Sequence, residues 1–207
     1  MKEIIKKSLT GAQVLGLFSL LGLGLVVLVA GLTEGRIAAN ERQALLDNLV
    51  KVVPADLYDN DIASDVTTIT DLTPELPVTV YRARQQGEPV AAVFTIIATN
   101  GYNGDIKLLV AVHRAGYVTG VRAVAHKETP GLGDGIEANR SQWIYAFDGK
   151  SLANPKPEQW AVKRDGGVFD QFTGATITPR AVVNAVKKVL IYFKQHQDKV
   201  FSPEQGA

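Results

Sequence analysis

The spacing of hydrophobic and polar positions changes along this 207-residue chain, and each spacing predicts a different element. Residues 8–33 contain no charged side chain, and residues 15–32 are almost entirely Leu, Val, Gly, Ala and Phe. A helix rises about 1.5 Å per residue and needs about 20 apolar residues to cross the hydrocarbon core of a bilayer. We therefore predict a transmembrane helix over residues 9–33, preceded by a short polar segment over residues 1–8.

The charges beside this apolar segment predict its orientation. Lys2, Lys6 and Lys7 precede it, and an excess of positive charge marks the cytoplasmic side of a membrane segment. Residues 1–8 are thus expected in the cytoplasm and everything after Glu34 on the opposite side. A cleaved signal peptide is the main alternative, because residues 29–31 are small. The apolar region of a signal peptide usually has only about 7 to 15 residues, which favours a retained anchor.

Residues 34–77 are expected to link the anchor to the rest of the chain. Apolar positions recur at helical spacing as far as Val52, and Pro54 would end such a helix. The stretch from Pro54 to Pro77 is rich in Asp, Thr and Pro, which indicates a loop or an irregular layer. We assign residues 34–77 to a linker helix and an irregular layer, and residues 78–207 to one extracytoplasmic domain.

Within that domain, short apolar runs separated by turn residues predict an antiparallel sheet. The expected strands are residues 78–83, 90–98, 106–113 and 117–125. A helix is expected over residues 139–147. A last long helix is expected to start at Thr178, a good N-cap, with Pro179 in the first helical position. Its apolar face would comprise Val182, Val183, Ala185, Val186, Val189, Leu190 and Phe193. The fold class is therefore α+β, with one N-terminal transmembrane helix and an antiparallel sheet flanked by helices.

Composition narrows the chemistry available to this domain. Lys and Arg total 22 against 21 Asp and Glu, so the chain lacks the basic field of a nucleic-acid-binding protein. Cysteine is absent, which excludes disulfides, thiolate catalysis and cysteine-ligated metal centres within this chain. Redox chemistry would therefore need another carrier.

A hydroxyl group next to the last helix is the most informative candidate for function. The segment Asp170-Gln171-Phe172-Thr173-Gly174-Ala175-Thr176 places Thr176 in a turn of small residues just before Thr178. Gly174 can adopt backbone angles closed to other residues, so a modifying enzyme could reach Thr176. The N–H groups and the dipole at a helix N-terminus also favour a phosphate held nearby.

This segment resembles a known motif. Asp170, Thr173, Gly174, Ala175 and Thr176 match the flavinylation motif of proteins with an FMN-binding domain. In that family a flavin transferase moves flavin mononucleotide (FMN) from FAD onto the hydroxyl of the final Thr. The resemblance implies that Thr176 carries FMN through a phosphoester bond.

A second segment strengthens the resemblance. His126-Lys127-Glu128-Thr129-Pro130-Gly131-Leu132-Gly133 resembles a stretch that helps to enclose the flavin in the RnfG and NqrC subunits of ion-pumping membrane oxidoreductases, and the chain length favours RnfG. Pro130, Gly131 and Gly133 would make a tight loop, and Leu132 could lie against an apolar ring face. The implied cofactor-binding residues are Thr176, Asp170, Thr173, Gly174, Ala175, Thr178, His126, Glu128, Thr129, Pro130, Gly131, Leu132 and Gly133.

The resemblance also implies a function and a location. The chain would be an electron-transfer subunit of an Rnf-type ion-translocating complex, linked to ferredoxin and NAD. It would lie in a bacterial inner membrane with a periplasmic domain, and its partners would be other Rnf subunits and, during maturation, the flavin transferase. The flavin would perform the chemistry, and no catalytic side chain is expected. The alternatives are an NqrC-like subunit of a sodium-pumping quinone reductase and a membrane-tethered assembly module without a cofactor.

The same residues allow simpler interpretations. Residues 173–178 could be only a Thr-rich helix cap. Gly131-Leu132-Gly133-Asp134-Gly135 lacks the third Gly and the βαβ unit of a dinucleotide loop. His113, His126 and Glu128 lack further ligands at zinc-site spacing, so we expect no metal. The aromatic side chains of residues 143–147 fit a core, and neither Asp134 nor Glu137 has a partner that the sequence identifies.

Overall fold

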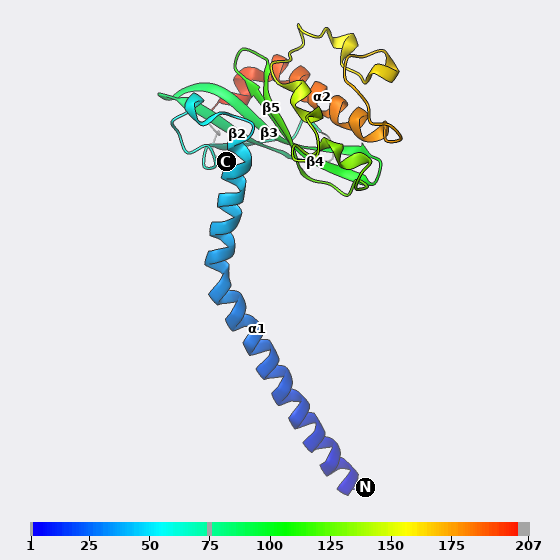
Figure 1. Cartoon of the computed structure of the whole chain (residues 1–207). Helices are drawn as coiled ribbons and strands as arrows, with labels where there is room; N and C mark the ends of the chain where they lie inside the picture. Colours follow the sequence, from blue (N-terminus) through cyan, green and yellow to red (C-terminus); the bar gives the residue numbers. More distant parts are fainter. Residues whose placement is uncertain (1, 74–75, 203–207) are drawn as a thin grey trace. The chain divides into compact units, whose positions relative to one another are not determined.

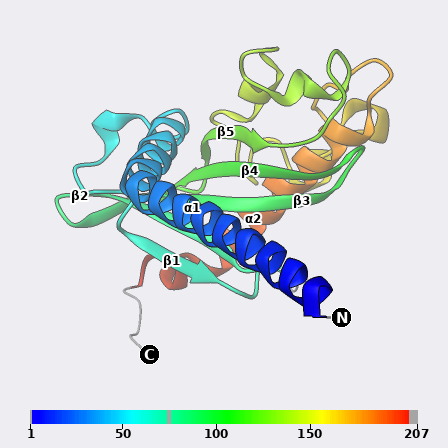
Figure 2. The same cartoon turned by 90° about the horizontal axis from the view of Figure 1, so that it is seen from below.

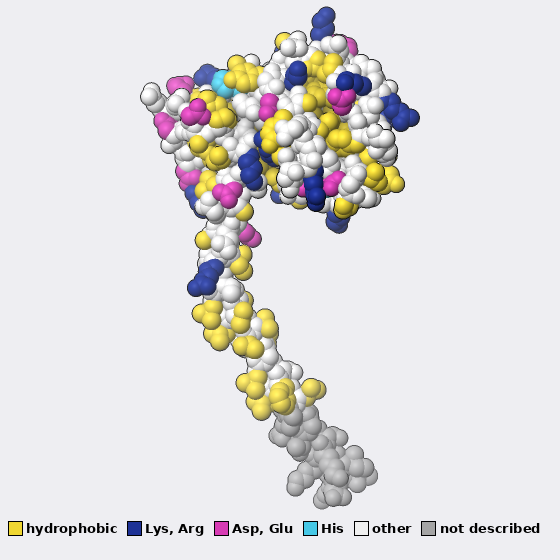
Figure 3. Space-filling view, viewed as in Figure 1, with side chains coloured by type: hydrophobic (Ala, Val, Ile, Leu, Met, Phe, Trp, Pro, Cys, Tyr) yellow, Lys and Arg dark blue, Asp and Glu magenta, His cyan; other side chains and the backbone are white. Residues whose placement is uncertain are grey.

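The computed structural model describes residues 2–73 and 76–202, with side chains described from residue 15 onward, and it divides the chain into two compact units, Met1–Ala44 and Leu45–Ala207. The first unit lies within helix α1 (Lys2–Val50). Its apolar side chains are exposed, as with Leu20 at 70% and Phe18 at 67%, and Figure 3 shows them along the visible side of the helix. Within Leu15–Val50 an 18-residue window reaches a mean hydropathy of 2.5, so this helix is long and apolar enough to cross a membrane.

The second unit is built on a five-stranded antiparallel sheet. Its strands are β1 (Val66–Ile69), β2 (Val78–Gln85), β3 (Glu88–Gly101), β4 (Gly104–His113) and β5 (Val118–Ala125). They are hydrogen-bonded in sequence order, which Figure 2 shows from below. Gln86 and Gly87 connect β2 to β3 with positive φ angles of 53° and 83°, as a tight two-residue hairpin turn requires. The expected antiparallel sheet is confirmed, and β1 adds a strand in a region expected to be irregular.

Both faces of the sheet are covered, by different segments. Helix α2 (Ile177–Phe201) packs on one face, where Phe94 of β3 meets Phe193 edge to face at 6.2 Å. Every residue of the expected apolar face of this helix is buried. The opposite face contacts Leu49, Val52 and Ile62. Residues 45–73, expected as linker helix and irregular layer, therefore contribute to the core of the domain, which the expected boundary at residue 78 excluded.

The chain between the sheet and α2 is mostly loops and short 3₁₀ helices, drawn in green to yellow in Figure 1. These helices are η2 (Gly133–Ile136), η3 (Trp143–Phe147), η4 (Pro157–Gln159) and η5 (Lys163–Asp165); a further one, η1 (Ala55–Leu57), precedes β1. The helix expected over residues 139–147 is therefore wrong in extent and type. A small aromatic core holds this region together, because Phe147 stacks on Phe169 at 4.7 Å and both contact buried Trp160.

Candidate functional site

The segment that ends in Thr176 forms a tight turn in front of α2. The backbone N–H of Ala175 donates to the carbonyl of Phe172 at 3.1 Å, and Gly174 closes the turn with a φ of 79°. Because this φ lies in the left-handed region, glycine suits the position better than any other residue. Thr176 follows as the N-cap of α2, half-buried and without a side-chain capping hydrogen bond. Its hydroxyl is therefore not engaged in the capping role that threonine often has at a helix start.

Helix α2 begins two residues earlier than expected. Ile177, not Thr178, is its first residue, so Thr178 lies inside the first turn and is not the N-cap. The first N–H groups of a helix have no intrahelical partner, and here the N–H of Arg180 closes the first turn on the carbonyl of Thr176 at 3.2 Å. Pro179 lacks an N–H. The N–H groups of Ile177 and Thr178 therefore lie at the positive end of the helix dipole, directly beside Thr176.

The second motif forms a compact loop. The carbonyl of Thr129 accepts hydrogen bonds from the N–H groups of Leu132 and Gly133 at 3.1 and 3.0 Å. The N–H of Gly131 donates to Asp134 Oδ1 at 2.8 Å, and Gly131 has a φ of 77°. These bonds turn the backbone back on itself and leave Leu132 at the surface, 49% exposed. Pro130 is half-buried beside it.

The two motifs, far apart in sequence, lie against each other. A Cβ atom added to Gly174 would lie 3.9 Å from Leu132 Cδ2, so the exposed Leu132 stands over the turn before Thr176. A Cβ on Gly135 would lie 2.9 Å from the ring of Phe172. The expectation that these segments form one site is therefore supported by their contacts.

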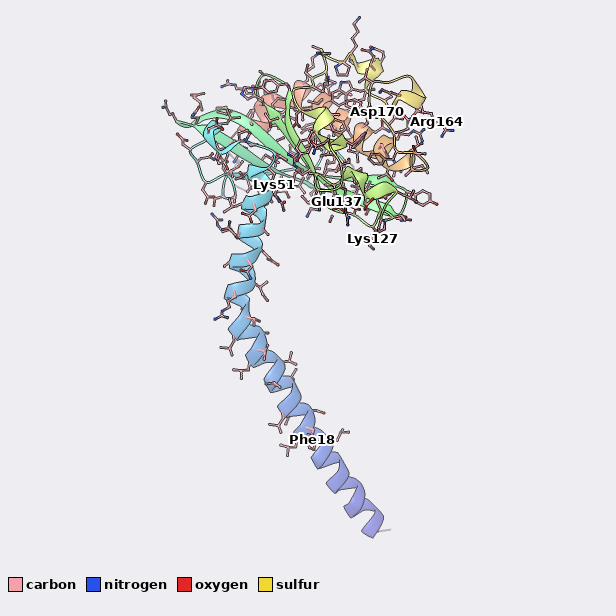
Figure 4. The ribbon with its side chains drawn as sticks, viewed as in Figure 1. Phe18, Lys51, Lys127, Glu137, Arg164 and Asp170 are labelled. Carbon is pink, nitrogen blue, oxygen red and sulfur yellow. The ribbon has the colours of Figure 1, made fainter. Side chains whose placement is uncertain are left out.

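The remaining site residues differ in how they face this junction. Thr173 is exposed in the turn, whereas Glu128 and Thr178 are buried and bonded to each other. Asp170 is exposed, forms an ion pair with Lys163 at 2.5 Å, and its carbonyl accepts a hydrogen bond from Trp143 Nε1. Figure 4 shows Asp170 at some distance from Glu137 and Lys127 of the other motif region.

His126 has a structural arrangement that the sequence did not reveal. Its Nε2 lies 3.0 Å from Glu137 Oε1, and its Nδ1 accepts a hydrogen bond from the N–H of Glu128 at 3.1 Å. These contacts fit a neutral imidazole that carries its proton on Nε2. Glu137 therefore has a partner, and so does Asp134, which lies 3.6 Å from Arg140 in addition to its bond with Gly131. Among residues whose side chains the structure describes, no group of three His, Asp or Glu gathers as metal ligands.

Asn103 is the residue of this region that sequence reasoning missed. Its N–H donates to Glu128 Oε1 at 3.0 Å, and its Nδ2 donates to Thr129 Oγ1 at 2.9 Å. It lies in the turn between β3 and β4, 25 residues before Glu128. The turn sequence predicted a hairpin, but no local pattern could have linked its tip to the second motif.

An ion pair adds a positive group near the start of α2. Arg180 donates two hydrogen bonds to Asp165, with Nε to Oδ2 at 2.6 Å and Nη2 to Oδ1 at 2.9 Å. The hydrogen bonds with Arg180 lower the pKa of Asp165. This paired geometry fixes the guanidinium one turn into the helix.

The geometry fits a phosphate-linked flavin. The hydroxyl of Thr176 makes no capping bond, and the first helical N–H groups beside it suit a phosphate. Leu132 and Ile177, at 49% and 44% exposure, offer apolar surface nearby. An aromatic ring with a phosphate tail needs this combination of an anion site and exposed apolar side chains.

Comparison with known proteins identifies both parts of the chain. The FMN-binding domain family matches residues 101–191, and the RnfG N-terminal region family matches residues 1–52. The G subunit of the ion-translocating oxidoreductase complex of Pseudomonas aeruginosa is 48% identical over 98% of this chain and 96% of its own. The protein of the same name from Shewanella piezotolerans is 44% identical over 95% and 94%. The crystal structure of Shewanella oneidensis NqrC gives a TM-score of 0.48 at 20% identity, over 74% of this chain and 73% of that one.

Proposed function

Because this chain belongs to the RnfG family of ion-translocating oxidoreductase complexes, we propose that it is a membrane-anchored electron-transfer subunit with FMN attached covalently to Thr176. The observation that carries the attachment site is the state of the threonines around the turn. Thr178 is fully buried and bonded to Glu128, so an enzyme cannot reach it. Thr176 has no capping bond and lies beside the first N–H groups of α2, which favour the phosphate.

Attachment transfers FMN from FAD and needs a flavin transferase. The Thr176 oxygen bonds to the phosphorus of the FMN half, the pyrophosphate bond of FAD breaks, and AMP leaves. The hydroxyl proton passes to a base of the transferase, because a threonine hydroxyl is hardly ionised at neutral pH. Gly174 and Ala175 leave the approach to the hydroxyl clear of bulky side chains.

The chain then positions the group and does no chemistry of its own. FMN supplies one- and two-electron transfer when attached. The loop at Leu132 offers an apolar surface, and the helix start holds the negative charge of the phosphodiester. We assign the electron partners to other subunits of the Rnf complex and the overall reaction to ferredoxin and NAD, consistent with the names of the relatives.

The location follows from α1. Its apolar segment anchors the chain in the bacterial inner membrane, and the lysines before it place the N-terminus in the cytoplasm and the domain in the periplasm. The absence of native cysteine allows a direct test. With Lys156→Cys, an exposed site, a membrane-impermeant maleimide should label intact spheroplasts. With Ser8→Cys it should label only after permeabilisation, and the reverse pattern would overturn the orientation.

The attachment is tested by following flavin on the denatured protein. We expect full-length chain expressed with the transferase to give a fluorescent band after denaturing electrophoresis, and peptide mapping to place one FMN phosphoryl group on Thr176. Thr176→Ala should abolish the fluorescence, because no other hydroxyl in the turn has the same setting. Thr176→Ser should retain part of it.

Thr119→Val serves as the matched control. It removes a threonine hydroxyl that bonds to the Val52 carbonyl at 2.8 Å in another part of the domain, and it should leave flavin loading unchanged. A dark wild-type band from cells with active transferase would contradict covalent attachment. An adduct on Thr173 would show that the exposed hydroxyl of the turn is the acceptor.

A further inference from the structure

A buried carboxylate joins the two motif segments. Glu128 is only 5% exposed, and its Oε2 accepts a hydrogen bond from the hydroxyl of fully buried Thr178. Its Oε1 accepts a second bond from the N–H of Asn103. A buried carboxylate is costly unless its oxygens are hydrogen-bonded, and both oxygens find donors inside the protein. The side chain therefore faces into the domain.

The backbone around this carboxylate leaves no spare room. A Cβ on Gly133 would lie 2.7 Å from Glu128 Oε2 and 3.1 Å from Thr178 Oγ1. A Cβ on Gly101 would lie 2.8 Å from Glu128 Oε1. The distances to the carboxylate are too short for ordinary contacts, so glycine at these two positions lets the backbone close on it. The arrangement connects the β3–β4 turn, the second motif and the first turn of α2.

The position of Leu132 depends on this junction. Leu132 directly precedes Gly133, and the N–H groups of both residues bond to the carbonyl of Thr129. Thr129 is held in turn by the side chain of Asn103 at 2.9 Å. When Glu128 and Thr178 are bonded, the loop is fixed against the start of α2 and Leu132 stands over Gly174.

We propose that Glu128 and Thr178 form a latch, the hydrogen-bonded pair that holds loop residues 129–135 against the first turn of α2. Both are positioning residues: they order the surface that a flavin on Thr176 meets and do not contact it themselves. The resemblance had suggested that both belong to the cofactor-binding surface, whereas their burial assigns them to its support. The effect on the flavin rests on the proposed function, but the latch is a property of the chain without flavin.

The latch is tested first on flavin-free, full-length protein in detergent, made without the transferase. Hydrogen–deuterium exchange of the peptide covering residues 129–135 is compared among wild type, Thr178→Val, Thr178→Ser and the remote control Thr119→Val. Valine keeps the shape of threonine but cannot donate to Glu128. We expect faster exchange of this peptide in Thr178→Val only, with Thr178→Ser and Thr119→Val close to wild type.

Two results would overturn the latch. One is unchanged exchange in Thr178→Val, and the other is equal acceleration in Thr178→Ser, which would assign the effect to packing of the methyl group. Should Thr178→Val fail to fold, Glu128→Gln replaces it. Glutamine keeps the shape and one accepting oxygen but faces one of the two donors with an amide NH₂, so a smaller acceleration is expected.

The consequence for the flavin is tested on protein made with the transferase. Thr178→Val should still give a fluorescent denatured band, because Thr176 is intact, but should lose most of the visible circular dichroism of the flavin and lower its fluorescence anisotropy. Dichroism and anisotropy equal to those of wild type would overturn the positioning role. A dark wild-type band would instead overturn the proposed function, while the exchange result would still decide the latch.

Discussion

Helices α1 and α2 are both long and rich in apolar residues, yet they use these residues in opposite ways. In α1 the apolar side chains from Leu15 to Leu32 surround the helix and are exposed. In α2 they are concentrated on one face, which is buried against the sheet, while Lys188 and Lys194 remain exposed. The comparison shows that arrangement, more than apolar content, separates a helix suited to lipid from one suited to a protein core.

The strongest test of this contrast replaces the same residue type in both helices. Phe193→Ala removes a side chain that is 2% exposed and packs on Phe94, so it should destabilise the domain by about 3–5 kcal/mol. Phe18→Ala removes a side chain that is 67% exposed and should leave the thermal midpoint of the domain unchanged. Unfolding followed by circular dichroism in detergent measures both. Equal midpoints for the two variants would contradict the contrast.

A smaller effect is expected when a charge is placed in each helix. Lysine near the centre of a membrane helix costs about 2.5–3.5 kcal/mol on insertion scales. Leu21→Lys should therefore reduce the fraction of protein that resists extraction from membranes at high pH. Ile191→Lys adds the same charge at a 38% exposed position of α2 and should not change that fraction. Full membrane retention of Leu21→Lys would argue against α1 as the anchor.

The smallest effect concerns the charged side of α2. Hydrogen bonds from Lys199 and Tyr192 lower the pKa of Asp71 to about 2, from an ordinary value of 3.8. Because the folded-state pKa is the lower one, the stabilisation is present above about pH 4 and is lost as the pH falls towards 2. Asp71 is 45% exposed, and exposed ion pairs contribute only about 0–1 kcal/mol. Asp71→Asn should slightly lower the thermal midpoint at pH 7 and match wild type near pH 2.

The sequence predicted those features that depend on local patterns. The strands, the apolar face of α2 and the turn before Thr176 all follow from spacing or from residues with special backbone angles, such as Gly174. The role of Thr178 did not, because a threonine before a proline at a helix start is typical of an N-cap and its real partner is 50 residues away. Strand β1 was missed because it is only four residues long and lies in a segment rich in turn residues.

The site was predictable as two motifs but not as a junction. Nothing local indicates that Asn103 bonds to Glu128 or that Glu137 bonds to His126, because these contacts arise when the β3–β4 turn and the loop after β5 come together. The extent of the core was underestimated for the same reason. Leu49 and Val52 fit the pattern of an outgoing helix, and only the folded sheet provides the apolar face that they cover.

The segment just after α1 meets the sheet at a point with a mechanical consequence. Thr119 Oγ1 bonds to the carbonyl of Val52 at 2.8 Å, and a Cβ on Gly120 would lie 2.8 Å from Val52 Cα, so the backbones are in close contact there. From this contact β5 leads over about six residues to His126, a distance of about 20 Å for an extended strand. One rigid strut thus connects Val52 to the loop beside Thr176. The stand-off between a group on Thr176 and the base of the domain is then set by strand length, and a swivel at the base would carry the whole site as a single body.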